Sequence, residues 1–406
     1  MEKRQKRLLL LGGTHNLIAV IKTAHKLGYY VITCDYLPNN IAHKYSDEYC
    51  NLSVTDKEAV LRLAIEKRID GILSFAIDPG VVTAGYVADK LGLPGASPYP
   101  SVCILQNKAL FRNFLKENGF NVPKAKGYKT ANEALKDVDH YNWPVIVKPV
   151  DSSGSKGVSK LCDPIHLGEA IETALQLSLS DEFIIEEFIE TRGYPFDSEC
   201  FSVNGKMKFV SFANQYFDSG AANPYTPSGY NWPASMSDSC QLELRNEFQR
   251  LISLLHMGTS IYNVETRVGV DGKAYIMEVS PRGGGNRLAE VLYYVTGVDL
   301  IAHTLRAAVG DELQDIKDAV YYDGEYWATI ILHSDRKGIF RGVQYDEHFP
   351  QEVIKELDFW VKKGDAVRAF SGGSDAIGII VMTFETEEQL STVMTNPKRW
   401  IKVIVE

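Results

Sequence analysis

The sequence lacks the long hydrophobic runs, paired cysteines and basic excess that mark several large classes of protein. The 406 residues contain no stretch of about 18 apolar residues, so we expect no membrane-spanning helix. None of the six cysteines forms a CxxC pair, which argues against a zinc site and favours a reducing, cytoplasmic compartment. The net charge of −9 argues against non-specific binding to nucleic acid. The net charge does not exclude a small anionic substrate held by a few local Lys or Arg side chains.

Two common nucleotide-binding motifs are also missing. The first apolar run ends in Gly12-Gly13-Thr14-His15, without the GxGxxG spacing, so we do not expect NAD or FAD. The loop Asp151–Gly157 lacks the GxxxxGK[ST] spacing of a Walker A motif. The early turn is then expected to belong to a scaffold domain and to face a cleft.

The first hundred residues alternate apolar strands with helices. The pattern predicts strands at 7–11, 29–34 and 71–75 and helices at 16–27, 57–67 and 81–91. Strands that alternate with helices of this length imply a parallel sheet covered on both faces. The Gly- and Pro-rich segment 92–100 predicts the exit from this unit.

Later segments are less regular. We expect a helix at 108–118, a strand at 145–147, a helix at 164–177 and a strand at 183–186. The stretch that follows, to about residue 310, is richer in strand patterns, and the remainder predicts strands with Gly-rich turns and one helix at 386–394.

The segment Ser260–Ser280 predicts a β-hairpin with two facing carboxylates. Two alternating apolar runs flank Asp271-Gly272, which is typical of a two-residue turn. With that turn, Glu265 and Glu278 lie directly opposite each other, with Cβ atoms about 5 Å apart. Like charges so placed destabilise a sheet unless a divalent cation such as Mg²⁺ lies between them. A longer turn would break the pairing and leave one carboxylate solvated, so this alternative stays open.

A lysine and a glycine-rich loop indicate phosphate binding. Lys148 ends an apolar strand and is followed by the loop Asp151–Gly157. Glycines let backbone N–H groups approach an anion, and hydroxyls add donors. Taken singly, Lys148 could also be a surface lysine at a strand end, and the Gly/Ser stretch could also be a plain loop. Together with the paired carboxylates they favour MgATP as the ligand.

Lys108, at the start of a helix, is followed in order by the strings VIVKPVDSSGSKGV, IIEEFIE, VET and IMEVSPR. This order resembles the ATP-grasp superfamily over nearly the whole chain. The EVSPR string is shared with formate-dependent glycinamide ribonucleotide transformylase, and biotin carboxylase, carbamoyl-phosphate synthetase and L-amino acid ligases are similar in layout. The resemblance implies a carboxylate–amine ligase.

The resemblance also implies the fold, which is α/β and α+β with four domains. A Rossmann-like pre-ATP-grasp domain would occupy 1–106, and a first ATP-grasp lobe with a mobile Gly/Ser loop 107–190. A second lobe with the metal site would occupy 191–310, and a small β-rich C-terminal domain 311–406.

Roles for individual residues follow from the resemblance. Two lysines would reach the ATP phosphates, a mobile loop would cover them, and a hinge would contact adenine through backbone groups. An acidic residue would hold the ribose hydroxyls, either Glu199 or, as the alternative, Asp197. The implied ATP-binding residues are Lys108, Lys148, Ser153, Gly154, Ser155, Lys156, Gly157, Val158, Glu186, Glu187, Phe188, Ile189 and Glu199.

The resemblance assigns the metal as well. Glu265 and Glu278 match the magnesium carboxylates, in agreement with the hairpin argument. Ser280, which stands where most relatives have Asn, would be a weaker third ligand. Arg282 matches the arginine that steadies the transferred phosphate, and with Lys148 it is the implied catalytic residue.

The implied reaction is ATP-dependent activation of a carboxylate as an acyl phosphate, followed by attack of an amine. The alternatives are a phosphotransferase that stops after phosphorylation and a nucleotide-binding protein without turnover. The expected cofactors are ATP and Mg²⁺. The expected partners are a small-molecule carboxylate and an amine, without nucleic acid or a membrane, and with a homodimer left open.

The look-alike transformylase differs from this chain where its substrate phosphate would bind. In the stretch AFSGGSDAIGIIV, Asp375 and Ala376 stand where two arginines are expected, and Arg368 is left alone. A phosphate monoester needs several cationic contacts, so we expect glycinamide ribonucleotide not to be the substrate. The stretch Gly283–Gly285 replaces an expected Asp and favours a smaller acceptor, such as an amino acid, because glycines leave room.

Overall fold

The apolar run Leu8–Leu11 lies at the centre of a parallel sheet with helices on both faces. The four strands, in the order β3-β2-β1-β4, are β1 (Arg7–Leu11), β2 (Tyr30–Asp35), β3 (Glu48–Asn51) and β4 (Gly71–Ser74). Leu8 and Leu10 pack on one face against α1 (Leu17–Lys26) and α10 (Leu300–Val309). Leu9 and Leu11 pack on the other face against α2 (Lys57–Lys67) and α3 (Asp78–Leu91). Burial on both faces is what the unbroken apolar run predicts.

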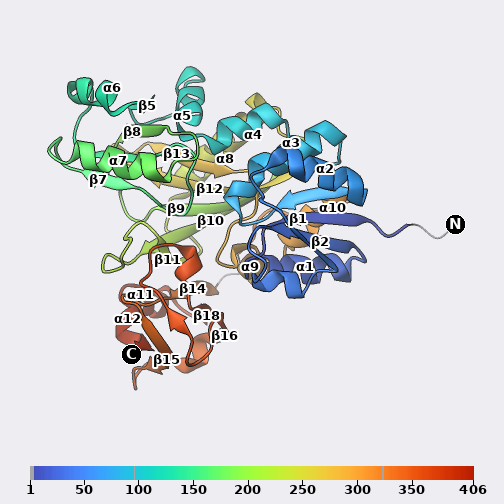
Figure 1. Ribbon diagram of the computed structural model, residues 1–406. Helices are drawn as coiled ribbons and strands as arrows, with labels where there is room; N and C mark the ends of the chain where they lie inside the picture. The colour runs from blue at the N-terminus through green and yellow to red at the C-terminus, as the bar shows by residue number, and fades with distance from the viewer. Residues whose placement is uncertain (1–3, 96, 322–323) are drawn as a thin grey trace.

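The computed structural model describes residues 4–95, 97–321 and 324–406. In Figure 1 the first sheet with α1, α2 and α3 forms one side of the molecule, drawn in shades of blue. A second, antiparallel sheet lies above and opposite it, in the order β5-β8-β6-β7. Its elements are β5 (Ala125–Tyr128), β6 (Val145–Pro149), β7 (Ser159–Leu161) and β8 (Phe183–Glu187), with α5 (Lys108–Glu117), α6 (Ala131–Lys136) and α7 (Leu167–Leu177).

The largest sheet has eight strands, in the order β13-β12-β9-β10-β11-β14-β18-β16. From residues 191–310 it takes β9 (Phe196–Val203), β10 (Lys206–Phe217), β11 (Pro227–Trp232), β12 (Ser260–Val268) and β13 (Ala274–Ser280). The helix α8 (Asp238–Leu254) packs on one face and α9 (Leu288–Thr296) on the other. This sheet carries most of the candidate site.

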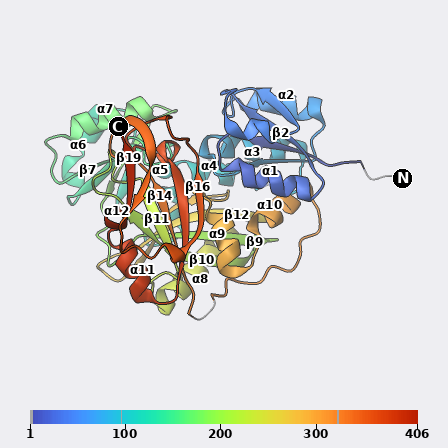
Figure 2. The same cartoon turned by 90° about the horizontal axis from the view of Figure 1, so that it is seen from below.

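The C-terminal segment is not confined to a sheet of its own. Its strands β14 (Tyr326–Leu332), β18 (Gly378–Phe384) and β16 (Ile354–Phe359) extend the eight-stranded sheet beyond β11. Seen from below, β14 and β16 continue beside β11 (Figure 2). The rest forms a small sheet of β15 (Gly338–Tyr345), β17 (Ala366–Val367) and β19 (Ile401–Val405), with α11 (Glu387–Met394) and α12 (Pro397–Trp400).

The predicted mixed α/β architecture is confirmed, and most predicted elements appear within a few residues of their expected bounds. The segment 92–100, however, is only partly a connection, because α4 (Tyr99–Gln106) begins inside it. Pro100 is tolerated there, since the first helical turn needs no N–H from it. In the described part of the chain, no helix is long and apolar enough to cross a membrane.

Candidate active site

Glu265 and Glu278 face each other across β12 and β13, as the hairpin argument predicts. The predicted two-residue turn is wrong. Gly269 N donates to Lys273 O at 2.9 Å, which leaves three residues in the turn and shifts the register by one. A β-bulge after Glu265 shifts the register back, so that the two carboxylates still pair. The Asp271 carboxylate explains the longer turn, because it accepts hydrogen bonds from Lys273 N and the Tyr275 hydroxyl.

The pair belongs to a row of three carboxylates, because Asp197 on β9 lies opposite Glu265. Burial raises the pKa of Glu265, and the charge of Glu278 adds to the effect. Burial and the charges of Glu199 and Glu265 raise the pKa of Asp197 well above its usual range. The Glu278 side chain is 32% exposed, so the pair is open to solvent on that side. The facing pair Glu265 and Glu278 fits a divalent cation, which would offset the repulsion between the two carboxylates.

Lys108 brings a positive charge from the start of α5 to this row. It opens α5, and its Nζ lies 3.7 Å from Glu278 Oε2 and donates to Ser152 O at 2.7 Å. Lys108 thereby joins three separately predicted features, namely the helix start, the Gly/Ser loop and the carboxylate pair.

Lys148 lies beside a buried ion-pair network that the sequence did not reveal. Its Nζ pairs with Glu186, whose other oxygen accepts from Arg112 Nε at 2.9 Å. Burial would raise the pKa of Glu186, but the charges of Arg112 and Lys148 hold it at about 2. Burial lowers the pKa of Lys148, against the attraction of Glu186. Arg112 stands four residues after Lys108, so α5 presents both cations on one face.

The hinge residues leave one backbone donor unused. Glu187 N donates to Lys124 O and Phe188 N to Pro144 O, each at 2.9 Å. Within the described residues, Ile189 N has no hydrogen-bond acceptor. The Phe188 ring has Lys160 Nζ at 3.6 Å and the Arg267 guanidinium at 5.8 Å from its centroid. A planar, apolar face bordered by cations and a free N–H suits a purine base.

The Gly/Ser loop adopts an unusual backbone conformation. Gly154, Ser155 and Gly157 all have positive φ, a left-handed conformation that glycine adopts readily and other residues seldom adopt. Ser155 Oγ donates to Tyr225 O at 2.8 Å, and Ser155 O accepts from Asn223 Nδ2 at 3.0 Å. The loop is therefore docked on the segment before β11.

Arg282 is held by Asp78, a residue that the sequence argument missed. Asp78 is the first residue of α3, and its Oδ1 lies 2.9 Å from Arg282 Nε and 2.6 Å from Nη2. Burial would raise the pKa of Asp78, but the Arg282 charge holds it below its usual range. The signal in the sequence for Asp78 is its position in a strand–helix turn, between β4 and α3.

Ser280 differs from the expectation of a metal ligand. Its hydroxyl donates to Asp78 Oδ1 at 3.0 Å and accepts from Gln106 Nε2 at 3.1 Å, and the residue is 1% exposed. Those bonds tie Ser280 to the Arg282–Asp78 pair. Glu265 and Glu278 are the metal ligands that the geometry favours.

Glu199 lies farther from the hinge than a ribose ligand should. It pairs with Asn263, two residues beyond Glu265 along β12, whereas the hinge end of β12 is at Val268. Its Oε1 accepts from Gly284 N at 2.8 Å and from Asn263 Nδ2 at 3.0 Å. Burial raises its pKa to about 8 in spite of these bonds and the Arg282 charge. Glu199 therefore supports the backbone next to Arg282.

The glycines after Arg282 do not leave the room expected of them. A Cβ on Gly283 would lie 2.2 Å from Phe75 Cζ, and one on Gly284 would lie 2.6 Å from Glu199 Oε1. Only at Gly285 would a Cβ meet nothing closer than 3.6 Å. Two of the three glycines serve close packing, so the expectation of open space there is wrong for them.

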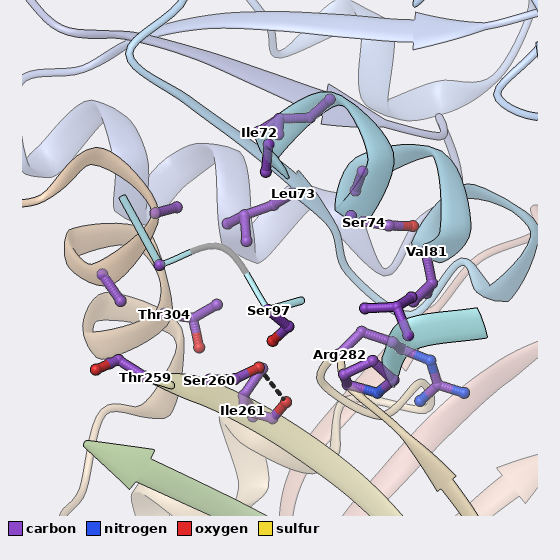
Figure 3. A pocket seen from close by; sticks show the side chains of 18 of the residues that line it. Ile72, Leu73, Ser74, Val81, Ser97, Thr259, Ser260, Ile261, Arg282 and Thr304 are labelled. Atoms are coloured by element: carbon purple, nitrogen blue, oxygen red, sulfur yellow. Dashed lines mark hydrogen bonds between the residues drawn. The ribbon is translucent and has the colours of Figure 1, made fainter. Parts of the chain in front are cut away.

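A small cavity of about 70 Å³ lies between the N-terminal sheet and the eight-stranded sheet. Figure 3 shows Ser74 and Val81 on one side, Ser260 and Thr304 on the other, and Arg282 at the edge. Its lining includes none of the predicted lysines or glutamates. The cavity is too small for a nucleotide and holds a few water molecules at most.

The fold brings Lys108, the Gly/Ser loop and the facing glutamates together in one site. Residues 105–286 match the family described as ATP-grasp domain, so this part of the chain is an ATP-grasp domain. ATP-grasp enzymes of this kind use ATP and Mg²⁺ and are ligases that form C–N bonds. The predicted family and cofactors are confirmed.

Two relatives and one solved structure illustrate the similarity. The chain is 30% identical over 199 residues to D-alanine–D-alanine ligase of Nitratiruptor sp., which covers 47% of this chain and 54% of that protein. It is 27% identical over 399 residues to formate-dependent phosphoribosylglycinamide formyltransferase of Bacteroides thetaiotaomicron, covering 97% and 98%. The crystal structure of L-amino acid ligase from Bacillus licheniformis matches with a TM-score of 0.80 at 22% identity over the whole of both chains, which shows the fold alone.

Proposed function

We propose that this protein is an ATP-dependent carboxylate–amine ligase that works through an acyl phosphate. The observation that carries the proposal is the facing pair Glu265 and Glu278 with Lys108 beside it. With a divalent cation held by the two glutamates, this cluster would neutralise the charge of a polyphosphate, which is most of what phosphoryl-transfer catalysis requires of a protein. Mg²⁺ held by the two glutamates would draw charge from the β- and γ-phosphates.

The reaction has two steps. A carboxylate oxygen of the substrate attacks the γ-phosphorus, and ADP leaves. An amine then attacks the acyl carbon, phosphate leaves, and the nitrogen gives up a proton. Arg282, which Asp78 fixes, would hold the transferred phosphoryl group. The Gly/Ser loop 153–158 would exclude water from the acyl phosphate.

The proposed contacts to ATP involve two lysines for the phosphates and the hinge for the adenine. Lys108 and Lys148 contact phosphates, and the hinge 186–189 contacts adenine with Ile189 N as the free donor. We assign no ribose contact to Glu199, because it lies under Gly284 on the far side of the carboxylate row.

A screen of carboxylate–amine pairs tests this function. ADP and phosphate release should depend on both substrates, and mass spectrometry should show the ligated product. Glu278→Gln should reduce Mg²⁺-dependent turnover at least about 100-fold, because one of the charges that holds the cation is lost. Glu243→Gln, on an exposed position of α8, is the matched control. Phosphorylation of the acid with no amine-dependent product would instead identify a phosphotransferase, and wild-type turnover in Glu278→Gln would refute the metal assignment.

The formyltransferase relative suggests glycinamide ribonucleotide as a substrate, and the structure supports the opposite proposal. Asp375 Oδ1 lies 2.6 Å from Arg368 Nη2, so the remaining arginine is already neutralised. The other Asp375 oxygen accepts from Ser371 N and Oγ. We propose that no phosphate clamp exists there and that the acceptor is smaller. Formylation of glycinamide ribonucleotide at ordinary enzymatic rates would contradict this.

A further inference from the structure

A buried arginine close to Lys148 uses only one of its hydrogen-bonding nitrogens. Arg112 on α5 is 2% exposed, and its Nε donates to Glu186 Oε2 at 2.9 Å. No group in the described segments accepts a hydrogen bond from Arg112 Nη1 or Nη2, and both nitrogens are buried. No residue one helical turn away on α5 is acidic, so Glu186 is the carboxylate that this arginine contacts. Unpaired buried donors destabilise a protein, so an acceptor that comes within their reach would bind them.

The Glu186 carboxylate is shared between two cations. Glu186 on β8 lies opposite Ile146 on β6, and Lys148 follows two residues later, so Glu186 and Lys148 share one face of the sheet. Oε1 of Glu186 pairs with Lys148 Nζ, and Oε2 accepts from Arg112 Nε. Lys148 is thus bound to a carboxylate of the protein, and a Lys148 Nζ that moves to a phosphate leaves Oε1 without its cation.

The unused nitrogens of Arg112 are suited to replace Lys148 at that oxygen. A guanidinium group is planar, and its Nε and a neighbouring Nη can donate side by side to the two oxygens of one carboxylate. Only the Nε bond is present here, so one further bond, from an Nη to Glu186 Oε1, would complete the two-bond pair. Lys148, with a flexible stem and a side chain that is 14% exposed, is the partner that can leave.

The local charge favours this exchange. Lys148, Arg112 and Glu186 together carry one net positive charge in a buried place. Burial lowers the pKa of Lys148, and the charges of Arg112 and Lys108 lower it further, against the attraction of Glu186. A phosphate beside Lys148 would supply the negative charge that this network lacks.

We propose that Arg112 is a positioning residue, which takes both oxygens of Glu186 and so releases Lys148 to the phosphates of ATP. The proposal rests on the ligase function, because that function assigns Lys148 to the phosphates. Arg112 is buried and touches no substrate, so it acts through Glu186. In the free protein Glu186 holds Lys148, and in the nucleotide complex Arg112 holds Glu186. The Glu186 carboxylate thereby keeps a partner on each oxygen in both states.

Binding measurements on the full chain test this role. Calorimetric titrations would compare a non-hydrolysable ATP analogue, with Mg²⁺ present, and adenosine, which lacks the phosphates. Arg112→Met leaves Lys148 as the only cation on Glu186, so affinity for the analogue should fall about 10-fold while affinity for adenosine stays unchanged. Arg341→Met is the matched control, because Arg341 Nε also bonds to one glutamate oxygen, that of Glu406 at 2.7 Å, but at an exposed position of β15.

A double variant shows whether Arg112 acts through Glu186. Adding Glu186→Gln to Arg112→Met removes the carboxylate that holds Lys148, so affinity for the analogue should recover to within about 3-fold of the wild type. Arg112→Lys keeps the buried charge without the planar fork and replaces Arg112→Met if that variant does not fold. It should lose at least about 3-fold in affinity for the analogue and nothing for adenosine.

Three results would overturn the positioning role. These are an equal loss of affinity for the analogue and for adenosine, an unchanged affinity for the analogue in the folded Arg112 variants, and no recovery in the double variant. The ligase function survives each of them if the wild type still releases ADP in an amine-dependent reaction. A wild type that binds no ATP analogue and forms no amine-dependent product would refute the ligase function, and this role with it.

Discussion

The pKa values of the acidic residues in the site depend on their burial and on the cations that they contact. The acids on β9 and β12 have raised pKa values because they share a dry face of the sheet, whereas Glu186 and Asp78 have lowered ones because each touches buried cations. The same residue type thus carries opposite shifts within one site. An acid with a raised pKa weakens the metal-free fold at neutral pH, and a bound cation or a proton relieves it.

Glu199 provides a test of how a raised pKa affects the stability of the fold. Its pKa is about 8 in the folded protein against 4.5 for an ordinary glutamate. Between these values the folded state holds a proton that the unfolded chain has lost, so stability falls as the pH rises, by at most about 1.4 kcal/mol per pH unit. We expect the free energy of unfolding of the wild type to fall relative to Glu199→Gln from about pH 5 upward, measured by denaturant titration in EDTA. A difference independent of pH would contradict the shift.

Asp78 provides a second test at this scale. Asp78→Asn removes the charge that fixes the Arg282 guanidinium, so kcat should fall about 10-fold or more while KM for ATP changes little. Asp89→Asn, at the exposed end of the same helix, is the control. Steady-state kinetics measures both. An equal kcat in Asp78→Asn and wild type would show that Arg282 needs no such partner.

The loops and strands of the site contact one another through residues that are far apart in the sequence, so no local sequence pattern predicts these contacts. The Gly/Ser loop of the first lobe docks on Asn223 and Tyr225, and Asn223 in turn bonds to Phe370 and Ser371 of the C-terminal segment. A loop held by a few polar bonds opens at low cost, as a lid must.

Residues 152–158 should therefore exchange their amide hydrogens quickly in the free protein and slowly with Mg²⁺ and an ATP analogue. Ser155→Ala, which removes the bond to Tyr225, should speed exchange in the free protein and weaken the protection. Hydrogen exchange with mass spectrometry measures this, with the turn 269–272 as an internal reference. Equal exchange with and without nucleotide would rule out a lid.

In the whole molecule, the C-terminal segment is joined to the second lobe by backbone pairing. The strand β14 bonds to β11 over four register pairs, and Arg287 beside the site pairs with Glu356 of β16 at 2.9 Å. His15 of the first turn stacks on Trp360 with ring centroids 5.4 Å apart. These contacts hold the C-terminal segment against β11, against Arg287 and against the turn after β1.

A chain that ends after Gly310 should for this reason fail to fold stably. It exposes the edge of β11 and the apolar side chains that β14 covers, which favours aggregation. Circular dichroism and gel filtration of the fragment, and calorimetry of the full chain, measure this. A soluble fragment that binds ATP, or a separate calorimetric transition for the C-terminal segment, would show that it is an independent domain.

Local pattern in the sequence determined much of the protein. The leucine run, the alternation of strands and helices and the order of the Lys, Gly/Ser and Glu motifs depend on neighbours a few residues apart, and they led to the parallel sheet, the facing glutamates and the family. Even there the turn was wrong, and the pairing of Glu265 with Glu278 survived because a bulge compensates for the longer turn.

Tertiary structure alone decided which distant residues meet. Asp78 meets Arg282 across 204 positions, and Arg112 meets Glu186 across 74. No local pattern marks such residues, since their role comes from desolvation and from partners brought close by folding.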